Sequence, residues 1–262
     1  MRDVLYEVDG ERYLPTDYTR GPWSLDHQHA GPPAALLTRA VEGASAIEGG
    51  QSVRLAFDIL RPVPVAPLTV AVRRLRPGRN VEQLEASLLD GETEVMRARV
   101  WRMRTEAVDL EDRLGEPLPP PAPPEDAVAG VRPHWWPEGS NAYHDALDWR
   151  WLRGHFVEPG PAVCWTRMNV DLVPGEPITP LQHLLVMADA ASGISSALDW
   201  AVWNFINVDL SLALERPPAG EWLAMDAVTT FGPVGAAVAT AVYSDLDGRV
   251  GTSSQAILVA PK

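Results

Sequence analysis

Cysteine is almost absent from the 262-residue chain, in which Cys164 is the single example. One thiol cannot form an internal disulfide, so the sequence excludes a disulfide framework and indicates a reducing compartment. Cys164 lies in the apolar run Ala162-Val163-Cys164-Trp165. A buried structural thiol is expected there, because free cysteine usually packs as a small hydrophobe. We therefore expect a cytoplasmic protein.

Long apolar runs and a targeting leader are also lacking. No stretch approaches the ~18 consecutive apolar residues of a membrane-spanning helix. The first residues, Met1–Glu7, do not have the basic and then apolar layout of a signal peptide. We expect no membrane association.

Positive charge is scarce, with 22 Lys and Arg against 35 Asp and Glu and a formal net charge of −13. This excess repels nucleic acid and anionic membranes, since phosphate binding needs a positive field. It does not exclude a CoA ester, whose few phosphates a local Arg cluster can hold. The densest positive run, Arg73–Arg79, could play that part or could be a solvated hairpin tip.

The motifs of nucleotide and metal sites are missing as well. The sequence has no Walker-type Gly-rich loop, no paired CxxC and no HExxH, each of which places ligand atoms at a fixed spacing. His27 and His29 are two residues apart, but no other compact ligand set stands near them. We therefore expect no metal and no cofactor.

Proline is concentrated in the middle of the chain, at Gly115–Asp126. Such a segment is not expected to join a helix or sheet, because proline has no N–H and a fixed φ. We therefore predict an N-terminal repeat at 1–106, a Pro-rich linker at 107–140 and a C-terminal repeat at 141–262.

The segments on either side of this linker show the same order of elements. Each has a predicted helix, at Gly31–Glu42 and at about 180–198, that begins with proline in its first turn. The Arg-Pro turns at 61 and 216 lie 155 positions apart, and the Gly hairpins at 91 and 248 lie 157 apart, which is the mark of an internal repeat. Strands are expected after the helices at 53–60, 68–75, 81–89, 95–103, 205–214, 222–230, 236–243 and 250–259, and before them at 12–18, 144–153 and 163–173.

The second predicted helix is apolar on most sides, which is typical of a buried helix. One buried helix followed by an antiparallel meander means a sheet curled around that helix. The sequence therefore predicts an α+β fold, a double hotdog of two repeats, each with a curved antiparallel sheet around a central helix. Such a chain could stay a monomer, and we favour a homodimer.

Five stretches together carry a resemblance to a known family. The chain resembles the acyl-CoA thioesterase II type of double-hotdog protein over nearly its whole length. The resemblance implies hydrolysis of an acyl-CoA or related acyl thioester to free acid and thiol. The stretches are His29–Leu37, Pro174–Leu181, Met187–Gly193, Phe205–Ser211 and Gly251–Gln255.

In that family an Asp on the second helix, a Thr or Ser early in the next strand and a Gln in the last strand handle the reacting water. By position, the resemblance assigns these catalytic roles to Asp189, Asn207 and Gln255. Asn207 departs from the pattern, because it has no hydroxyl. Asp189 is the only acid between residues 180 and 198, where a buried carboxylate needs a polar partner. It could be a general base or half of a structural ion pair, and Asp209 is the alternative acid.

Three residues are candidates for substrate binding. The helix beginning at Gly31 could bind a carbonyl or phosphate through its free N–H groups, with His29 beside it. Gly193 shares a helical face with Asp189 and could leave room for an acyl group. Several tryptophans could line an acyl channel or pack in the core, notably Trp135, Trp136, Trp149 and Trp151.

The equivalents of Asp189 and Gln255 in the first half are Arg39 and Ala98, so we expect one site per chain. Two other functions stay open. A non-catalytic protein that binds acyl-CoA or an acyl carrier is favoured by Asn207. A hotdog hydratase or dehydratase would need an Asp/His pair, and His183 lies six positions before Asp189, off its helical face.

Overall fold

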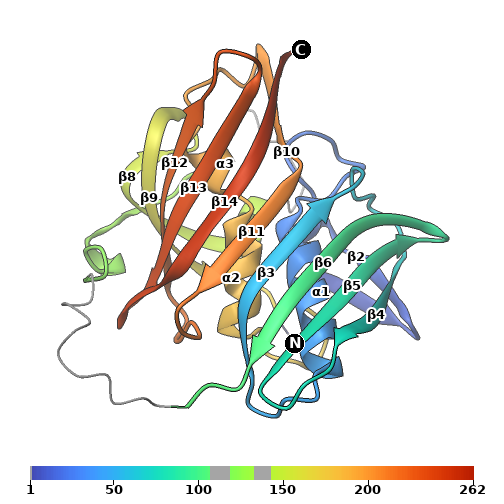
Figure 1. Cartoon of the computed structure of the whole chain (residues 1–262). Coiled ribbons are helices and arrows are strands. Elements are labelled where there is room, and N and C mark those ends of the chain that lie inside the picture. Colours follow the sequence, from blue (N-terminus) through green and yellow to red (C-terminus); the bar gives the residue numbers. More distant parts are fainter. Residues whose placement is uncertain (1, 107–118, 133–142) are drawn as a thin grey trace.

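The computed structural model describes residues 2–106, 119–132 and 143–262. Its strands form one 14-stranded sheet in the order β1-β2-β4-β5-β6-β3-β11-β14-β13-β12-β9-β8-β7, with β10 beside β14 (Figure 1). Every pairing between these strands is antiparallel. The first-half strands are β1 (Tyr6–Asp9), β2 (Arg12–Pro15), β3 (Gln51–Ile59), β4 (Leu68–Arg76), β5 (Val81–Asp90) and β6 (Thr93–Met103). The others are β7 (Val128–Ala129), β8 (Leu147–His155), β9 (Glu158–Met168), β10 (Trp203–Asn207), β11 (Asp209–Leu214), β12 (Leu223–Phe231), β13 (Ala236–Asp245) and β14 (Gly248–Pro261).

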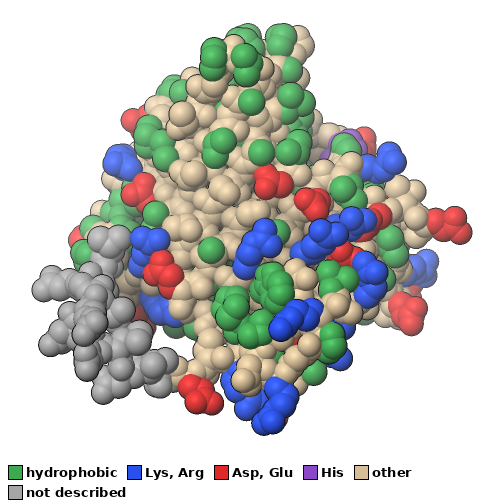
Figure 2. Space-filling view, viewed as in Figure 1, with side chains coloured by type: hydrophobic (Ala, Val, Ile, Leu, Met, Phe, Trp, Pro, Cys, Tyr) green, Lys and Arg blue, Asp and Glu red, His purple; other side chains and the backbone are tan. Residues whose placement is uncertain are grey.

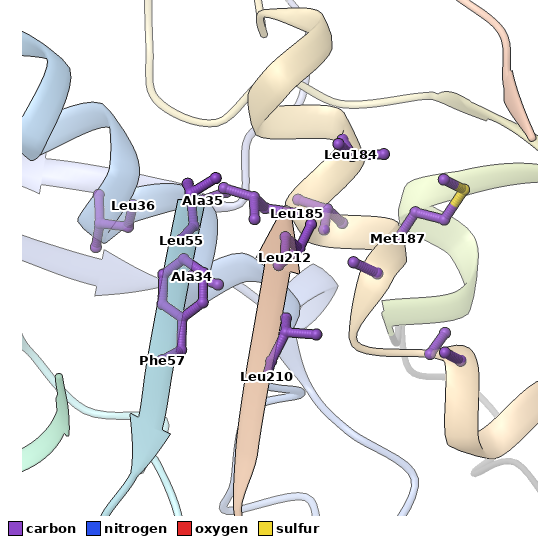
Figure 3. Packing of buried hydrophobic residues seen from close by; sticks show 14 of the residues in the cluster. Ala34, Ala35, Leu36, Leu55, Phe57, Leu184, Leu185, Met187, Leu210 and Leu212 are labelled. Atoms are coloured by element: carbon purple, nitrogen blue, oxygen red, sulfur yellow. The ribbon is translucent and has the colours of Figure 1, made fainter. Parts of the chain in front are cut away.

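The two halves join at the centre of this sheet, where β3 pairs with β11. The helices α1 (Gly31–Ala44) and α2 (Pro180–Ala188) lie together on one side of the sheet. Figure 3 shows Phe57 of β3 and Leu210 of β11, which are register partners, beside the buried side chains of the two helices. One continuous core therefore spans both halves. The predicted order of a helix followed by a meander is confirmed in each half.

Local sequence explains where the two helices begin. Thr179 and Gln182 form a capping box, in which the Thr179 hydroxyl accepts from the Gln182 N–H and the Gln182 side chain accepts from the Thr179 N–H. Gly31 opens α1 at a point where a Cβ would overlap the Val186 carbonyl oxygen. The absence of a side chain at Gly31 thus lets the start of α1 approach α2.

The predicted helix at 180–198 is wrong in its continuity and its end. The structure has two helices there, α2 and the short α3 (Ala191–Ile194). Asp189 is the C-terminal cap of α2, and the Ala190 N–H bonds to the Met187 oxygen instead of continuing the helical ladder. The predicted strand 205–214 is likewise two strands. They meet at Val208, beyond which β11 pairs with β3 as well as with β14.

The strands expected before the helices are present but differ in length. Residues 12–18 form only the short β2 and then a 3₁₀ turn at Asp17–Thr19, while β9 ends at Met168. The segment expected to be linker also contains structure. Pro124–Asp126 forms a 3₁₀ turn and β7 pairs with β8, whereas 107–118 and 133–140 lie outside the described residues. Within the described chain, no helix is both long and apolar enough to cross a membrane.

Candidate active site

A pocket of about 330 Å³ opens between the two halves of the chain. The loop before α1, the end of β3 and the α2–α3 junction supply its walls, together with β10. Most of its lining is apolar. His29, Asp189 and Asn207 are the polar side chains that this lining shares with the predicted site.

Asp189 is at the centre of the polar group. It is 5% exposed, and its two carboxylate oxygens face different partners. Oδ2 lies 2.8 Å from Nδ1 of His29. Oδ1 accepts from Nδ2 of Asn207 at 2.6 Å and from Nε2 of Gln255 at 3.2 Å. The structure therefore brings together four residues that the sequence named for different roles.

Chain geometry explains why these groups meet. Asp189 stands at the break between α2 and α3, which frees its carboxylate from the helical surface. Asn207 is the last residue of β10, just before the bend at Val208. Gln255 is on β14, and its Oε1 accepts from the Ser192 N–H at 3.2 Å. Gln255 thus connects β14, the last strand of the chain, to the end of α2 and to α3.

Gln255 differs from the other members in its access. It is 1% exposed and does not line the pocket. Its amide nitrogen donates to the Asp189 side chain and backbone oxygen, both at 3.2 Å, while its oxygen is used by Ser192. In this arrangement Gln255 positions Asp189.

His29 reaches Asp189 from the other half of the chain. Its ring stacks on Tyr143, with centroids 3.7 Å apart and planes 1° from parallel. Tyr143 is fixed in turn by a 2.7 Å bond from its hydroxyl to the Val186 oxygen. Because a carboxylate accepts only, the 2.8 Å contact with Asp189 places the proton on Nδ1. The Gly31 N–H, 3.4 Å from the same atom, then makes no hydrogen bond to it. Nε2 is then an acceptor, and among the described residues it has no hydrogen-bond partner, since the polar contacts of this ring are made by Nδ1.

These contacts determine the charge of Asp189. Burial raises its pKa, but the charge of His29 in its protonated form and the hydrogen bond from His29 lower it, and so do the Asn207 amide and the Ala30 N–H. The net effect holds the pKa below the ordinary value of an aspartate. A helix N-terminus favours negative charge, and Ala30 is the N-cap of α1. Asp189 is therefore anionic at neutral pH.

The two candidate glycines have different surroundings. Gly31 does not line the pocket, and its place is set by the close approach to Val186. Gly193 does line it. A Cβ on Gly193 would lie 3.7 Å from the Trp200 ring, so the space beside it is already bounded by an indole.

The remaining sequence candidates lie away from the pocket. Asp209 accepts from the Ala256 N–H at 2.6 Å. His183 faces the Thr166 hydroxyl at 2.9 Å, and burial lowers its pKa to about 3. Cys164 is fully buried, as expected, and burial raises the pKa of its thiol. None of the three lines the pocket.

The first-half equivalents also lie elsewhere. Arg39 forms a two-pronged ion pair with Glu176, and Ala98 is buried in the sheet core. Neither lines the pocket beside Asp189.

The dense arginine run does not contribute to the pocket either. Arg73 pairs with Glu85, and Arg74 pairs with Glu82. Figure 2 shows Lys and Arg side chains gathered over the strands of the first half. The cation in the pocket lining is instead the exposed Arg61, whose guanidinium forms no ion pair with any residue that the structure describes.

Of the candidate tryptophans, Trp149 and Trp151 stack in the core. Trp135 and Trp136 lie outside the described residues. The indoles that line the pocket are Trp23 and Trp200, which the sequence gave no reason to select. Across the described ranges, no group of three or more His, Cys, Asp or Glu is arranged to hold a metal ion.

Comparison with solved structures identifies the class of fold. The chain is similar to a candidate thioesterase from Novosphingobium aromaticivorans, with TM-score 0.74 and 21% identity over 95% of this chain and 96% of that one. It is similar to a hot dog fold protein from Alicyclobacillus acidocaldarius, with TM-score 0.69 and 17% identity over 97% and 94%. It is also similar to the acyl-CoA thioesterase II TesB2 of Mycobacterium marinum, with TM-score 0.68 and 16% identity over 97% and 95%. The predicted double-hotdog fold is confirmed.

Comparison with protein families is more specific. Residues 19–103 match the acyl-CoA thioesterase N-terminal domain, and residues 122–259 match the acyl-CoA thioesterase C-terminal domain. The chain therefore belongs to the acyl-CoA thioesterase family and is a thioester hydrolase. No curated protein matches its sequence.

Proposed function

We propose that this protein hydrolyses an acyl-CoA thioester in the pocket beside Asp189, with His29 as the group that takes the proton from water. The 2.8 Å contact between His29 Nδ1 and Asp189 Oδ2, at the wall of a mostly apolar pocket, carries this proposal. A carboxylate beside an imidazole fixes the orientation of the ring and the nitrogen that carries the proton, which leaves the other nitrogen facing the reacting water.

The hydrogen bonds of Asp189 support this division of roles. A carboxylate has about four lone-pair positions, and donors from His29, Asn207, Gln255 and the Ala30 N–H already face this one. A water could reach Asp189 only by displacing one of them. Nε2 of His29 needs no such displacement, because none of the described residues bonds to it.

The chemistry then proceeds in two steps. His29 takes a proton from a water molecule while the oxygen of that water attacks the thioester carbonyl carbon. The tetrahedral adduct collapses, the C–S bond breaks, and the imidazolium returns the proton to the leaving thiolate. Asn207 lines the pocket, and its Oδ1 accepts no bond from the described residues, so it can hold the attacking water. An amide oxygen could in this way take the place of the hydroxyl expected from the resemblance.

Charge at the pocket supports CoA as the thiol. Arg61 and His27 are exposed lining residues. Arg61 can form charge-assisted hydrogen bonds with a phosphate. In a chain with a net charge of −13, these two side chains are the part of the pocket lining suited to the CoA phosphates.

The proposal is tested by thiol release from a panel of acyl-CoA esters. Wild type should release thiol from at least one ester, and His29→Gln should lower kcat by ~10²-fold or more, the usual size of a general-base contribution. His27→Gln is the matched control and should keep kcat, with at most a higher KM. Equal losses in both variants, or full activity of His29→Gln, would contradict the assignment of His29.

Gln255→Ala and Asn207→Ala separate positioning from contact with water. Loss of the Gln255 amide should cost ~10-fold or more in kcat by loosening Asp189, with KM nearly unchanged. Asn207→Thr should retain more activity than Asn207→Ala, because a hydroxyl can also hold a water. If Asn207→Ala is as active as wild type, Asn207 has no part in the chemical step.

The same pair of residues also favours a second candidate function. A hydratase or dehydratase needs an Asp/His pair, and the His29–Asp189 contact provides one that the sequence did not reveal. An assay of enoyl-CoA hydration, measured as loss of the ultraviolet absorbance of the enoyl thioester, decides between hydrolysis and hydration. Absorbance change without thiol release would replace hydrolysis by hydration. Binding of acyl-CoA with neither reaction would identify a binding protein.

A further inference from the structure

A second hollow of about 590 Å³ lies next to the active-site pocket. The two share three lining residues, Pro22, Trp23 and Trp200. The rest of the second hollow is built from the 156–159 turn, residues 196–201 and Lys262. The shared residues therefore form a partition between the two spaces.

The partition is an aromatic cluster. The Trp23 and Trp200 rings stack at a centroid distance of 4.5 Å and an interplanar angle of 26°. Phe205 meets both rings edge-on, at 5.2 Å from Trp23 and 4.4 Å from Trp200. Such pairs gain attraction beyond the area they bury, so the partition is closed in this conformation. Trp23 is nevertheless 41% exposed, with the Lys262 ammonium 5.9 Å from its ring centroid, so it is the less buried half of the stack.

The partition stands where the acyl chain must go. Trp200 lies against Gly193, and both Gly193 and Asp189 line the active-site pocket. An acyl chain whose carbonyl carbon is attacked by a water at His29 Nε2 can therefore reach the indole of Trp200 along the same pocket wall. Arg61 and His27, which also line this pocket, are the side chains suited to the phosphates.

Charge argues that the second hollow belongs to the acyl group rather than to CoA. Its charged lining residues are Glu158, Asp199 and Lys262, so carboxylates outnumber cations there. Phosphates are repelled by such a lining, whereas its apolar members, among them Phe156, Val157 and Leu198, suit a hydrocarbon chain.

We propose that the Trp23–Trp200 stack is the determinant of acyl length, and that the hollow behind it is an extension of the acyl site that longer chains reach only when the stack opens. This inference rests on the proposed function for the identity of the substrate. With the stack closed, the acyl group is confined to a pocket near the lower end of the range for small-molecule sites, ~300–1,000 Å³. Short acyl groups are then preferred.

Binding of non-hydrolysable alkyl-CoA thioethers tests this without requiring turnover. Affinities of butyl-, octyl- and hexadecyl-CoA are measured by calorimetry for wild type, Trp200→Ala and Trp23→Ala. Wild type should bind hexadecyl-CoA more weakly than butyl-CoA. Each variant should raise the ratio of hexadecyl to butyl affinity by ~10-fold or more, the size of effect that added hydrocarbon contacts give in an apolar pocket.

Trp222→Ala is the matched control, because this half-buried indole packs under Arg167 and lines neither hollow. Its affinity ratio should equal that of wild type. Trp23→Ala keeps the test open if Trp200→Ala does not fold, since Trp23 lies on an exposed loop. An unchanged ratio in the folded Trp variants, or a wild type that prefers hexadecyl-CoA or binds none of the three, overturns the inference. If the ratios shift while no acyl-CoA ester is hydrolysed, the proposed function fails and the length determinant stands.

Discussion

At the scale of single residues, the site depends on one carboxylate that is buried and yet charged. Burial alone would favour the neutral form of Asp189, but His29, Asn207 and the Ala30 N–H hold its pKa below the ordinary value. This balance gives His29 an anionic partner at neutral pH. In the proposed mechanism, Asp189 acts mainly through the histidine that it orients.

Asp189→Asn tests this dependence. Asparagine keeps the shape but cannot carry the charge, so kcat should fall by ~10²-fold or more with little change in KM. Because the pKa of Asp189 is lowered, its protonation can affect wild-type activity only below the usual range of a carboxyl group. Rates are measured from mildly alkaline to acid pH.

An acid limb in the usual range of an aspartate or above it would therefore report a group other than Asp189. A fully active Asp189→Asn would exclude Asp189 from the mechanism, and Asp209 would become the next acid to replace.

The residues of this site were only partly predictable from the sequence. Asp189, Asn207 and Gln255 came from the position of motifs, and they are in contact. The contact of His29 with Asp189 crosses the two halves, and no local spacing encodes it. Trp23 and Trp200 were missed for the same reason, since an indole in a loop has no sequence pattern that separates a pocket wall from a core.

At the scale of elements, the geometry depends on how closely α1 approaches α2. Gly31 permits the contact with Val186, and the residues at the ends of these helices, His29 and Asp189, then meet. From the sequence, Gly31 was a candidate for substrate binding through the free N–H groups at the start of the helix. The structure gives it a packing role that a one-dimensional pattern could not reveal.

Gly31→Ala should therefore separate the helices. The added methyl group overlaps the Val186 carbonyl, and overpacking of this kind typically costs ~1–3 kcal/mol. Stability to urea should fall, and kcat should fall with it because the His29–Asp189 contact lengthens. Denaturation midpoints and turnover are measured together.

Gly43→Ala is the internal control on the same helix. A Cβ there meets nothing within 4 Å, so the change should stabilise the protein by up to ~1 kcal/mol through helix propensity and leave kcat unchanged. Equal behaviour of the two variants would show that the approach at Gly31 is not critical.

Element boundaries show a similar limit of sequence reasoning. The apolar run after Pro180 predicted one helix, because hydrophobicity continues through Asp189 and beyond. Tertiary contacts accompany the break, since Gln255 bonds to Asp189 at the end of α2 and to Ser192 in α3. The division of β10 from β11 likewise reflects the change of strand partner at Val208, which alternation along one strand cannot report.

At the scale of the whole molecule, two similar halves share one sheet and one core but not the same chemistry. The repeat offset placed Arg39 and Ala98 opposite the second-half site, and the structure finds them in an ion pair and in the core. The repeated turns thus predicted the architecture well, because they mark the chain directly. The repeated turns could not predict the pocket between the halves, because it is formed by residues that are distant in the sequence.

Arg39→Ala should therefore leave the chemical step intact. Arg39 and Glu176 are partly exposed, and such pairs contribute ~0–1 kcal/mol, so a small loss of stability is the expected result. Turnover equal to wild type, with one alkyl-CoA bound per chain by calorimetry, would support a single site. A loss as large as that of Asp189→Asn in a folded protein would indicate a second site in the first half.

The buried histidine of α2 makes the stability of the whole molecule depend on pH. His183 is held against Thr166, and burial lowers its pKa from 6.5 to about 3. Between these two values the unfolded chain binds a proton that the folded chain does not, so stability must fall as pH falls. Above 6.5 the contribution is constant. Burial lowers the pKa of His144 and His155 as well, so they act in the same direction.

Urea midpoints at neutral pH and at about pH 5 measure this effect. Wild type should be less stable at the lower pH, and His183→Gln should show a smaller difference between the two, whatever its absolute stability, because the variant no longer takes up that proton on unfolding. The exposed His27→Gln is the control and should keep the wild-type difference. If His183→Gln also keeps it, the buried imidazole does not determine the acid sensitivity of the fold, and His144 and His155, whose pKa values are lowered in the same direction, are the groups to replace next.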